Sequence, residues 1–226
     1  MNDLYLCIHY GLGDYVMCYG LVKELSKRYN KIFLFGIPHI SNLHLENIKR
    51  LYSSIKNVEV IIDSPKLYKN VLYIGYDKFF NDIKKDPTIQ CAKYFYDQAG
   101  VPLNLMWDNF YFKRDLNREK EIYHSILKDG EEYVFLHDDP SRNYVIDREY
   151  VNLGIKMICL NDLPNVSILD TLYLIEKAKE VHIENTGLVS FIDQMNIKHD
   201  NLNYHSYTRP SISEQPILKL NWNIIN

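Results

Sequence analysis

The sequence predicts an α/β protein whose strands are mostly parallel. Short apolar runs that fit buried strands alternate with segments in which apolar residues recur every three or four positions, the spacing of an amphipathic helix. Parallel strands need such helical connections, because each strand must start again at the same edge of the sheet. The 226 residues, 46% of them hydrophobic, are enough for one or two globular domains of this class.

The first half of the chain opens on an apolar strand at residues 4–9, which ends at a glycine-containing turn. The helix predicted at 15–29 has one apolar face and a charged opposite face that includes Lys23 and Glu24. The further elements predicted in this half are a strand at 31–37, a helix at 42–55, strands at 58–62 and 71–75, and a helix at 88–98.

The same alternation starts again near Lys113. The elements predicted there are helix 118–128, strands 133–137 and 156–160, helix 168–177, strand 180–184 and a helix that begins at Thr186. We therefore expect two Rossmann-like halves that face each other across a cleft. Alternating apolar residues at 218, 220, 222 and 224 suit a half-buried strand near the end of the chain.

Charge and composition exclude several classes of function. A net charge of -3 gives no cationic field, so nucleic-acid binding by charge is not expected. No apolar run reaches the roughly 18 residues of a membrane span, and the first residues do not read as a signal peptide. The four cysteines show no C-x-x-C pair, and no D-x-D, P-loop or G-x-S-x-G motif is present. We expect a cytoplasmic protein that holds no metal and no other cofactor.

In a parallel sheet, ligands bind at the carboxyl ends of the strands, so the loops at that edge carry the candidate site. The first such loop reads Gly11-Leu12-Gly13-Asp14. Gly11 and Gly13 permit a tight turn, and Asp14 falls in the first turn of the following helix. Two interpretations stay open for Asp14: it caps the helix, or its carboxylate is a general base at the mouth of the cleft.

Two loops of the second half suit an anionic ligand. Thr186 and Gly187 lie where a strand runs into a helix, and Ser190 follows one turn later, so backbone N–H groups and hydroxyls are available to an anion. Arg142 follows another strand of the same sheet and can hold a phosphate in fork geometry. The alternatives are an ordinary helix cap at Thr186 and a solvated surface charge at Arg142.

These motifs, in this order, resemble the heptosyltransferase-like glycosyltransferases of the GT-B fold. The family's Gly-x-Gly-Asp turn is matched by Gly11-Leu12-Gly13-Asp14, its Asp-Thr-Gly-Leu turn by Asn185-Thr186-Gly187-Leu188, and its Phe-Leu-His segment by Phe135-Leu136-His137. The resemblance implies an acceptor-side domain at 1–112, a nucleotide-sugar-binding domain at 113–210, and a tail at 211–226 that packs back on the first domain.

The resemblance also implies the activity, a metal-independent and inverting transfer of a hexose or heptose from a nucleotide-diphosphate sugar to a glycan or other hydroxyl acceptor. Asp14 inherits the role of catalytic base. The implied donor site has its diphosphate at Ser141, Arg142, Thr186, Gly187 and Ser190, and its nucleoside near His137 and Asn161. A sugar-nucleotide epimerase and a non-catalytic nucleotide- or sugar-binding module are the alternatives.

Overall fold

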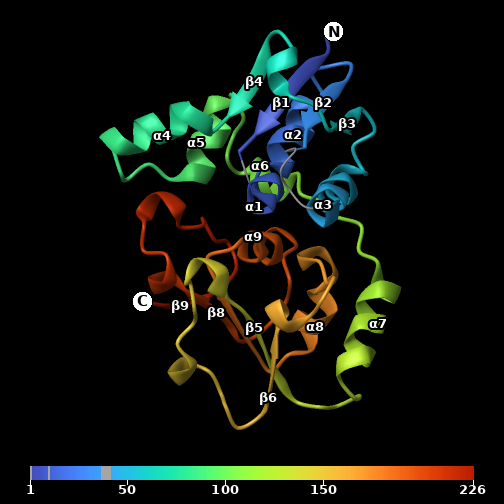
Figure 1. Cartoon of the computed structure of the whole chain (residues 1–226), viewed down its shortest axis with the longest axis vertical. Helices are drawn as coiled ribbons and strands as arrows, with labels where there is room; N and C mark the ends of the chain where they lie inside the picture. The colour runs from blue at the N-terminus through green and yellow to red at the C-terminus, as the bar shows by residue number, and fades with distance from the viewer. Residues whose placement is uncertain (1, 10, 37–41) are drawn as a thin grey trace. The chain divides into compact units, whose positions relative to one another are not determined.

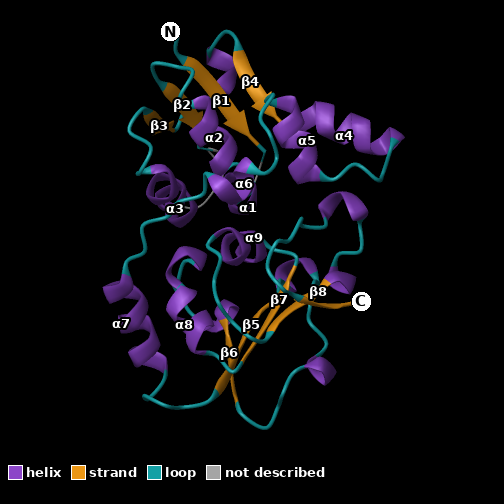
Figure 2. Ribbon diagram, turned by 180° about the vertical axis from the view of Figure 1, so that it is seen from behind, coloured by secondary structure: helices purple, strands orange, loops and turns teal. Residues whose placement is uncertain are grey.

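A computed structural model describes residues 2–9, 11–36 and 42–226, without the side chains of residues 42, 43 and 141 (Figure 1). Tyr10 of the predicted glycine turn and Ile37 of the predicted second strand lie outside the described residues. The chain divides into two compact units, Met1–Phe112 with Ser211–Ser213 and Lys113–Pro210 with Glu214–Asn226. Each unit has its own sheet with surrounding helices (Figure 2), which confirms the predicted α/β class.

The sheet of the first unit has the order β3-β2-β1-β4, and every pairing in it is parallel. The strands are β1 (Leu4–Ile8), β2 (Ile32–Phe35), β3 (Val58–Ile61) and β4 (Val71–Ile74). The helices are α1 (Leu12–Met17), α2 (Tyr19–Leu25), α3 (Asn42–Tyr52), α4 (Tyr76–Lys85), α5 (Cys91–Gln98) and α6 (Leu105–Asp108). The carboxyl ends of β1 and β4 lie side by side, so the turns after these two strands share one edge of the sheet.

Two features of the first unit differ from the prediction. The single helix expected at 15–29 is two helices, α1 and α2, because the chain bends at Cys18, whose ψ is 1°. The bend brings Gly20 so close to α6 that a Cβ there would lie 2.0 Å from the carbonyl oxygen of Leu105. Helix α4 was not predicted, because it is mostly polar and buries only Phe79.

The sheet of the second unit has the order β6-β5-β7-β8-β9, again with parallel pairings throughout. The strands are β5 (Tyr133–His137), β6 (Lys156–Cys159), β7 (Glu180–Glu184), β8 (Leu202–His205) and β9 (Asn223–Ile225). The helices are α7 (Leu116–Ile126), α8 (Leu172–Lys177) and α9 (Gly187–Gln194). Helices α7 and α8 lie side by side (Figures 1 and 2).

The end of the chain joins the second sheet. Strand β9 pairs with β8, with Tyr204 opposite Ile224. The predicted packing of residues 211–226 against the first half is therefore wrong for residues 214–226, which belong to the second unit, whereas Ser211–Ser213 group with the first. The physical reason is that the parallel edge of β8 offers unpaired backbone groups, and β9 satisfies them.

One face of the second sheet lacks a helical cover. Across the sheet, the chain moves in one direction from β5 to β6. It moves in the opposite direction from β6 to β7 through α8 and from β7 to β8 through α9. With right-handed crossovers, the β5–β6 connection then lies alone on its face. It holds short 3-10 turns and no α-helix, and its Ile146 and Val151 pack on Val134 and Leu136 of β5.

The half of that face formed by β7 and β8 is polar. Glu180, His182 and Glu184 alternate along β7, and the register places Asn203 beside His182 and His205 beside Glu184. Successive side chains of a strand point to opposite faces, so these five residues share one face of the sheet. His182, Glu184, Asn203 and His205 are all buried.

Candidate functional site

The glycine turn after β1 is fixed by Asp14. Gly11 precedes the first residue of α1, and its N–H donates to Oδ2 of Asp14 at 2.7 Å, while the N–H of Asp14 donates back to the carbonyl of Gly11. The half-buried carboxylate therefore does cap the helix. The contact uses one acceptor position of a carboxylate that has about four, so it is compatible with a second role for Asp14.

His9, at the end of the same strand, is enclosed by aromatic rings. Its ring centroid lies 5.0–5.9 Å from those of Tyr76, Phe79, Phe80 and Phe95. Nδ1 of His9 accepts the N–H of Tyr76 at 3.0 Å, which assigns the proton of the neutral ring to Nε2. Burial lowers the pKa of His9 to about 4, so the ring is a weak base at neutral pH.

In the second unit, the turn between β7 and α9 contains Asn185 and Thr186. The side-chain amide of Asn185 donates to the carbonyl of Glu214 at 2.7 Å, and the Asn185 carbonyl accepts Nη1 of Arg209 at 2.8 Å. Thr186 is the N-cap of α9, but its hydroxyl makes no capping bond, and Oγ1 is buried with no hydrogen-bond partner among the described residues. Glu214 and Arg209 thus hold the turn through Asn185, and the Thr186 hydroxyl is left for another partner.

The loop after β5 carries alternating charges. Arg142, at the end of the 3-10 turn Pro140–Arg142 that also contains Ser141, donates from Nε to Asp139 at 2.5 Å. Arg148 donates to the buried carboxylate of Asp138 at 2.9 Å. Each arginine therefore has a carboxylate partner. The guanidinium of Arg142 is half exposed and can exchange that partner for a ligand.

The two residues predicted to contact the nucleoside do lie together. Nδ1 of His137, at the end of β5, is 3.0 Å from Oδ1 of Asn161, in the turn after β6. Because the amide oxygen only accepts, Nδ1 carries the proton in this contact. Burial lowers the pKa of His137, so the ring is neutral and presents an acceptor nitrogen at Nε2.

Three charged or titratable residues of this region carry no signal in the sequence motifs. Glu184 has no exposed surface, and neither of its oxygens has a hydrogen-bond partner among the described residues. Burial raises the pKa of Glu184 to about 7. Arg209 packs beside the α9 turn, and His205 ends β8 opposite Glu184. Glu184 and His205 end β7 and β8, and Arg209 follows β8 after a 3-10 turn. Only these positions, visible after the fold is known, point to the site.

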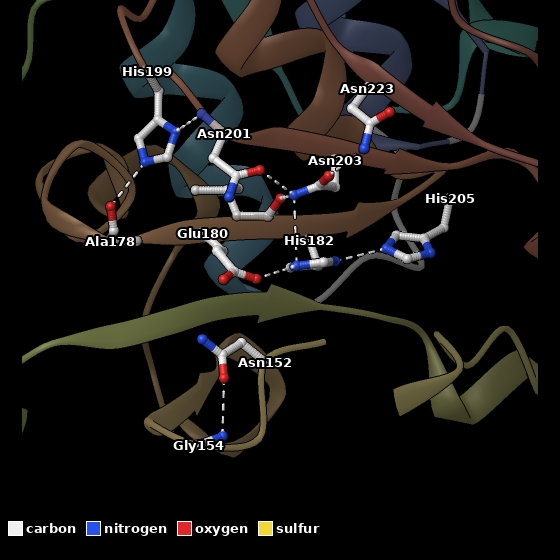
Figure 3. Close-up of polar contacts among 11 residues, drawn as sticks. Asn152, Gly154, Ala178, Glu180, His182, His199, Asn201, Asn203, His205 and Asn223 are labelled. Atoms are coloured by element: carbon white, nitrogen blue, oxygen red, sulfur yellow. Dashed lines mark hydrogen bonds and ion pairs between the residues drawn. The ribbon is translucent and has the colours of Figure 1, made fainter. Parts of the chain in front are cut away.

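A hydrogen-bonded chain runs along the polar face of the sheet. Figure 3 shows His182 between Glu180 and His205, with His182 Nε2 3.2 Å from the Glu180 carboxylate and His182 Nδ1 2.9 Å from Nε2 of His205. An ionised Glu180 accepts from His182 Nε2, so His205 must donate to Nδ1 of His182. The chain therefore ends on the unprotonated Nδ1 of His205, which is buried and has no described partner.

Within the described ranges, no cluster of three His, Cys, Asp or Glu side chains is arranged to hold a metal ion. The helices found in those ranges are all too short or too polar to cross a bilayer.

Comparison with known proteins gives structural matches only. Neither the protein-family models nor the curated proteins contain a match to this sequence. A glycosyl transferase family 9 structure from Veillonella parvula DSM 2008 is similar with a TM-score of 0.52 and 9% identity, over 99% of this chain and 85% of that one. This likeness confirms the fold that the sequence motifs implied.

Two further structures match less well. They are an E. coli ADP-heptose lps heptosyltransferase II, with a TM-score of 0.46 and 10% identity over 100% of this chain and 90% of that one, and the E. coli heptosyltransferase WaaC with ADP, with a TM-score of 0.42 and 11% identity over 90% and 86%.

Proposed function

We propose that the protein is a metal-independent, inverting glycosyltransferase that uses a nucleotide-diphosphate sugar. The observation that carries the proposal is the turn Asn185–Gly187, where a strand end, the start of α9 and the unpaired hydroxyl of Thr186 come together. Free N–H groups at a helix N-terminus favour phosphate. The likeness to a glycosyl transferase family 9 structure supports the same class of reaction.

In this proposal the second unit binds the donor. The diphosphate lies at Thr186, Gly187 and Ser190, with Arg142 and the Ser141 turn as its further contacts. The nucleoside lies at the ends of β5 and β6, where His137 and Asn161 meet. A neutral imidazole and an amide offer hydrogen bonds to base or ribose without adding charge.

Negative charge grows on the diphosphate as the bond to the sugar breaks. Donors that are already in place stabilise that charge without reorganisation, and Arg142 adds a full positive charge. Asp14 of the first unit takes the proton from the attacking hydroxyl of the acceptor. This division of roles needs no divalent ion.

The test is a binding screen followed by a transfer assay. Nucleoside diphosphates and nucleotide sugars are expected to raise the melting temperature, because a ligand that binds only the folded state stabilises it. The donor that binds is then incubated with candidate glycan acceptors, with and without EDTA. Transfer that survives EDTA supports the proposal. Conversion of the donor alone to an epimer, or binding with no transfer to any acceptor, contradicts it.

A further inference from the structure

Arg209 is the best-fixed cation near the α9 turn. Its Nη1 donates to the carbonyl of Asn185 at 2.8 Å, and its guanidinium lies over the ring of Tyr144 with 4.9 Å to the centroid. Nη2 is 3.4 Å from the carboxylate of Glu214, whose side chain is 45% exposed. Only 17% of the Arg209 side chain is exposed. The guanidinium is therefore ordered and shielded before any ligand arrives.

This placement makes Arg209 a stronger anion-binding group than Arg142. The Arg142 side chain is 54% exposed, against 17% for Arg209. A shielded charge acts through a lower effective dielectric constant, and a side chain that is already ordered loses little entropy on binding. The long Glu214 contact is one that a phosphate oxygen can replace.

Unpaired polar atoms gather around the same turn. Nε of Arg209, Oγ1 of Thr186 and both carboxyl oxygens of Glu184 are buried and have no hydrogen-bond partner among the described residues. Buried polar groups in proteins are nearly always satisfied, and exceptions cluster at sites with a role. Two of these atoms are donors, as an anion requires, but Glu184 suits an anion only in its neutral form, whose hydroxyl donates.

Burial is the main cause that favours this neutral form of Glu184, and the nearby charges act in both directions. Arg209 and Arg142 favour the ionised carboxylate, whereas Asp138 and Asp139 oppose it. His205, its cross-strand neighbour, stays neutral because burial lowers its own pKa to about 4. With burial added, the pKa of Glu184 rises to about 7. A bound anion contributes more negative charge and occupies Arg209, so both changes favour protonation further.

We propose that Arg209 holds the anionic group of the ligand at the Asn185–Gly187 turn, and that Glu184 takes up a proton when this anion binds. The inference rests on the proposed function, in which the anion is the donor's diphosphate. No covalent step is involved: a proton moves from solvent to the Glu184 carboxyl group, and its hydroxyl then joins the donors around the turn. Binding of diphosphate therefore weakens as the pH rises through neutrality.

The experiment is isothermal titration of the full chain with ADP, UDP, GDP and inorganic pyrophosphate. Each titration is repeated in two buffers of different ionisation enthalpy, which measures proton uptake. At about pH 7.5 the wild-type protein is expected to take up a fraction of a proton per bound diphosphate. Glu184→Gln, a neutral isostere, is expected to bind without proton uptake and with no loss of affinity at higher pH.

Arg209→Ala is expected to weaken binding about tenfold or more, and Arg209→Lys, which keeps the charge but not the fork, to weaken it less. Arg118→Ala is the matched control, since Arg118 is an exposed arginine of the same unit. Circular dichroism checks that the variants fold.

The outcomes separate this inference from the proposed function. Diphosphate binding that is unchanged in both Arg209 variants, or that takes up no proton in the wild-type protein, overturns the inference and leaves the donor proposal standing. The wild-type measurement needs no variant, so an unfolded Arg209→Ala protein does not remove the test. If no diphosphate binds the wild-type protein, both proposals fail.

Discussion

The indole N–H of Trp222 donates to the carboxylate of Asp193 in α9, at 3.1 Å, and both groups are buried. The same carboxylate accepts the backbone N–H groups of Lys219, at 3.0 Å, and Leu220, at 2.9 Å. One side chain of α9 thus fixes the segment that leads into β9. A buried carboxylate is stable in this place because several donors surround it.

Asp193→Asn is expected to lower the free energy of unfolding by about 2–3 kcal/mol, because an amide nitrogen would replace one acceptor and face backbone donors. Urea unfolding followed by circular dichroism measures the change. The exposed Asp200 of the same unit provides the control, as Asp200→Asn should change the free energy by less than about 0.5 kcal/mol. Equal effects of the two substitutions would show that Asp193 does not hold the tail.

Elements with a clear apolar pattern were predictable. Strand β7 has the predicted bounds, because Val181 and Ile183 alternate with polar residues between two turns. Strand β8 was missed. Its sequence, Leu-Asn-Tyr-His, has polar residues on the face that a helix-free connection covers, so it does not read as a buried strand. A buried polar face depends on what covers it, and the local sequence does not carry that information.

The candidate site divides in the same way. Thr186 and Gly187 follow a strand and begin a helix, so motif and spacing place them. Arg209 follows a 3-10 turn, Ser206–Thr208, in no recognisable pattern. Only the fold brings Arg209 to Asn185, 24 positions earlier in the chain. The roles of all these residues stay predictions, as does the cleft between the two halves.

The buried carboxyl group of Glu184 predicts an unusual pH dependence of stability. Its pKa of about 7 in the folded protein is above its ordinary value of 4.5, so the folded state binds this proton more tightly than the unfolded state does. Ionisation of Glu184 therefore destabilises the folded protein. This destabilisation is absent below about pH 4.5 and fully present above about pH 7. Glu184→Gln removes it.

The Glu184→Gln protein should accordingly exceed the wild type in free energy of unfolding by about 3 kcal/mol at about pH 8, and the difference should shrink as the pH falls and vanish below about pH 4.5. Denaturant unfolding at a series of pH values measures this difference. A constant difference across the series would mean that Glu184 does not titrate in this range.

Arg142 is expected to affect phosphate binding and not nucleoside binding. In the free protein its guanidinium is paired with Asp139, so a phosphate has to displace that carboxylate. Arg142→Ala should weaken binding of a nucleoside diphosphate about tenfold, and Asp139→Asn, which removes the competing charge, should strengthen it. Titration with a nucleoside and with its diphosphate separates the effect on nucleoside binding from the effect on phosphate binding. Equal losses for both ligands in Arg142→Ala would place Arg142 away from the phosphates.

Thr186→Val is expected to weaken diphosphate binding by a smaller factor than Arg142→Ala does, because it removes a neutral hydrogen-bond donor and not a charged one. The substitution keeps the shape of the side chain. It removes no capping hydrogen bond, since the Thr186 hydroxyl forms none. Tighter binding by the valine variant would show that the hydroxyl does not meet the ligand.

Asp14 provides the sharpest test of catalysis. Asp14→Asn keeps the size of the side chain, and its amide oxygen can still accept the N–H of Gly11, so folding stability should change little. Removal of the proton acceptor should lower the rate of sugar transfer by a factor of about 10² to 10⁴, while donor affinity is unchanged. Asp77 lies in the first turn of α4 in the same unit, and Asp77→Asn is the matched control.

The helix N-terminus favours the ionised carboxylate, which makes Asp14 a ready but weak base. Such a base suits a late proton transfer, after the bond between sugar and phosphate has largely broken. Transfer near the wild-type rate in Asp14→Asn would restrict this residue to capping α1, and His137 would then be a better candidate than His9, whose pKa of about 4 leaves it little basicity.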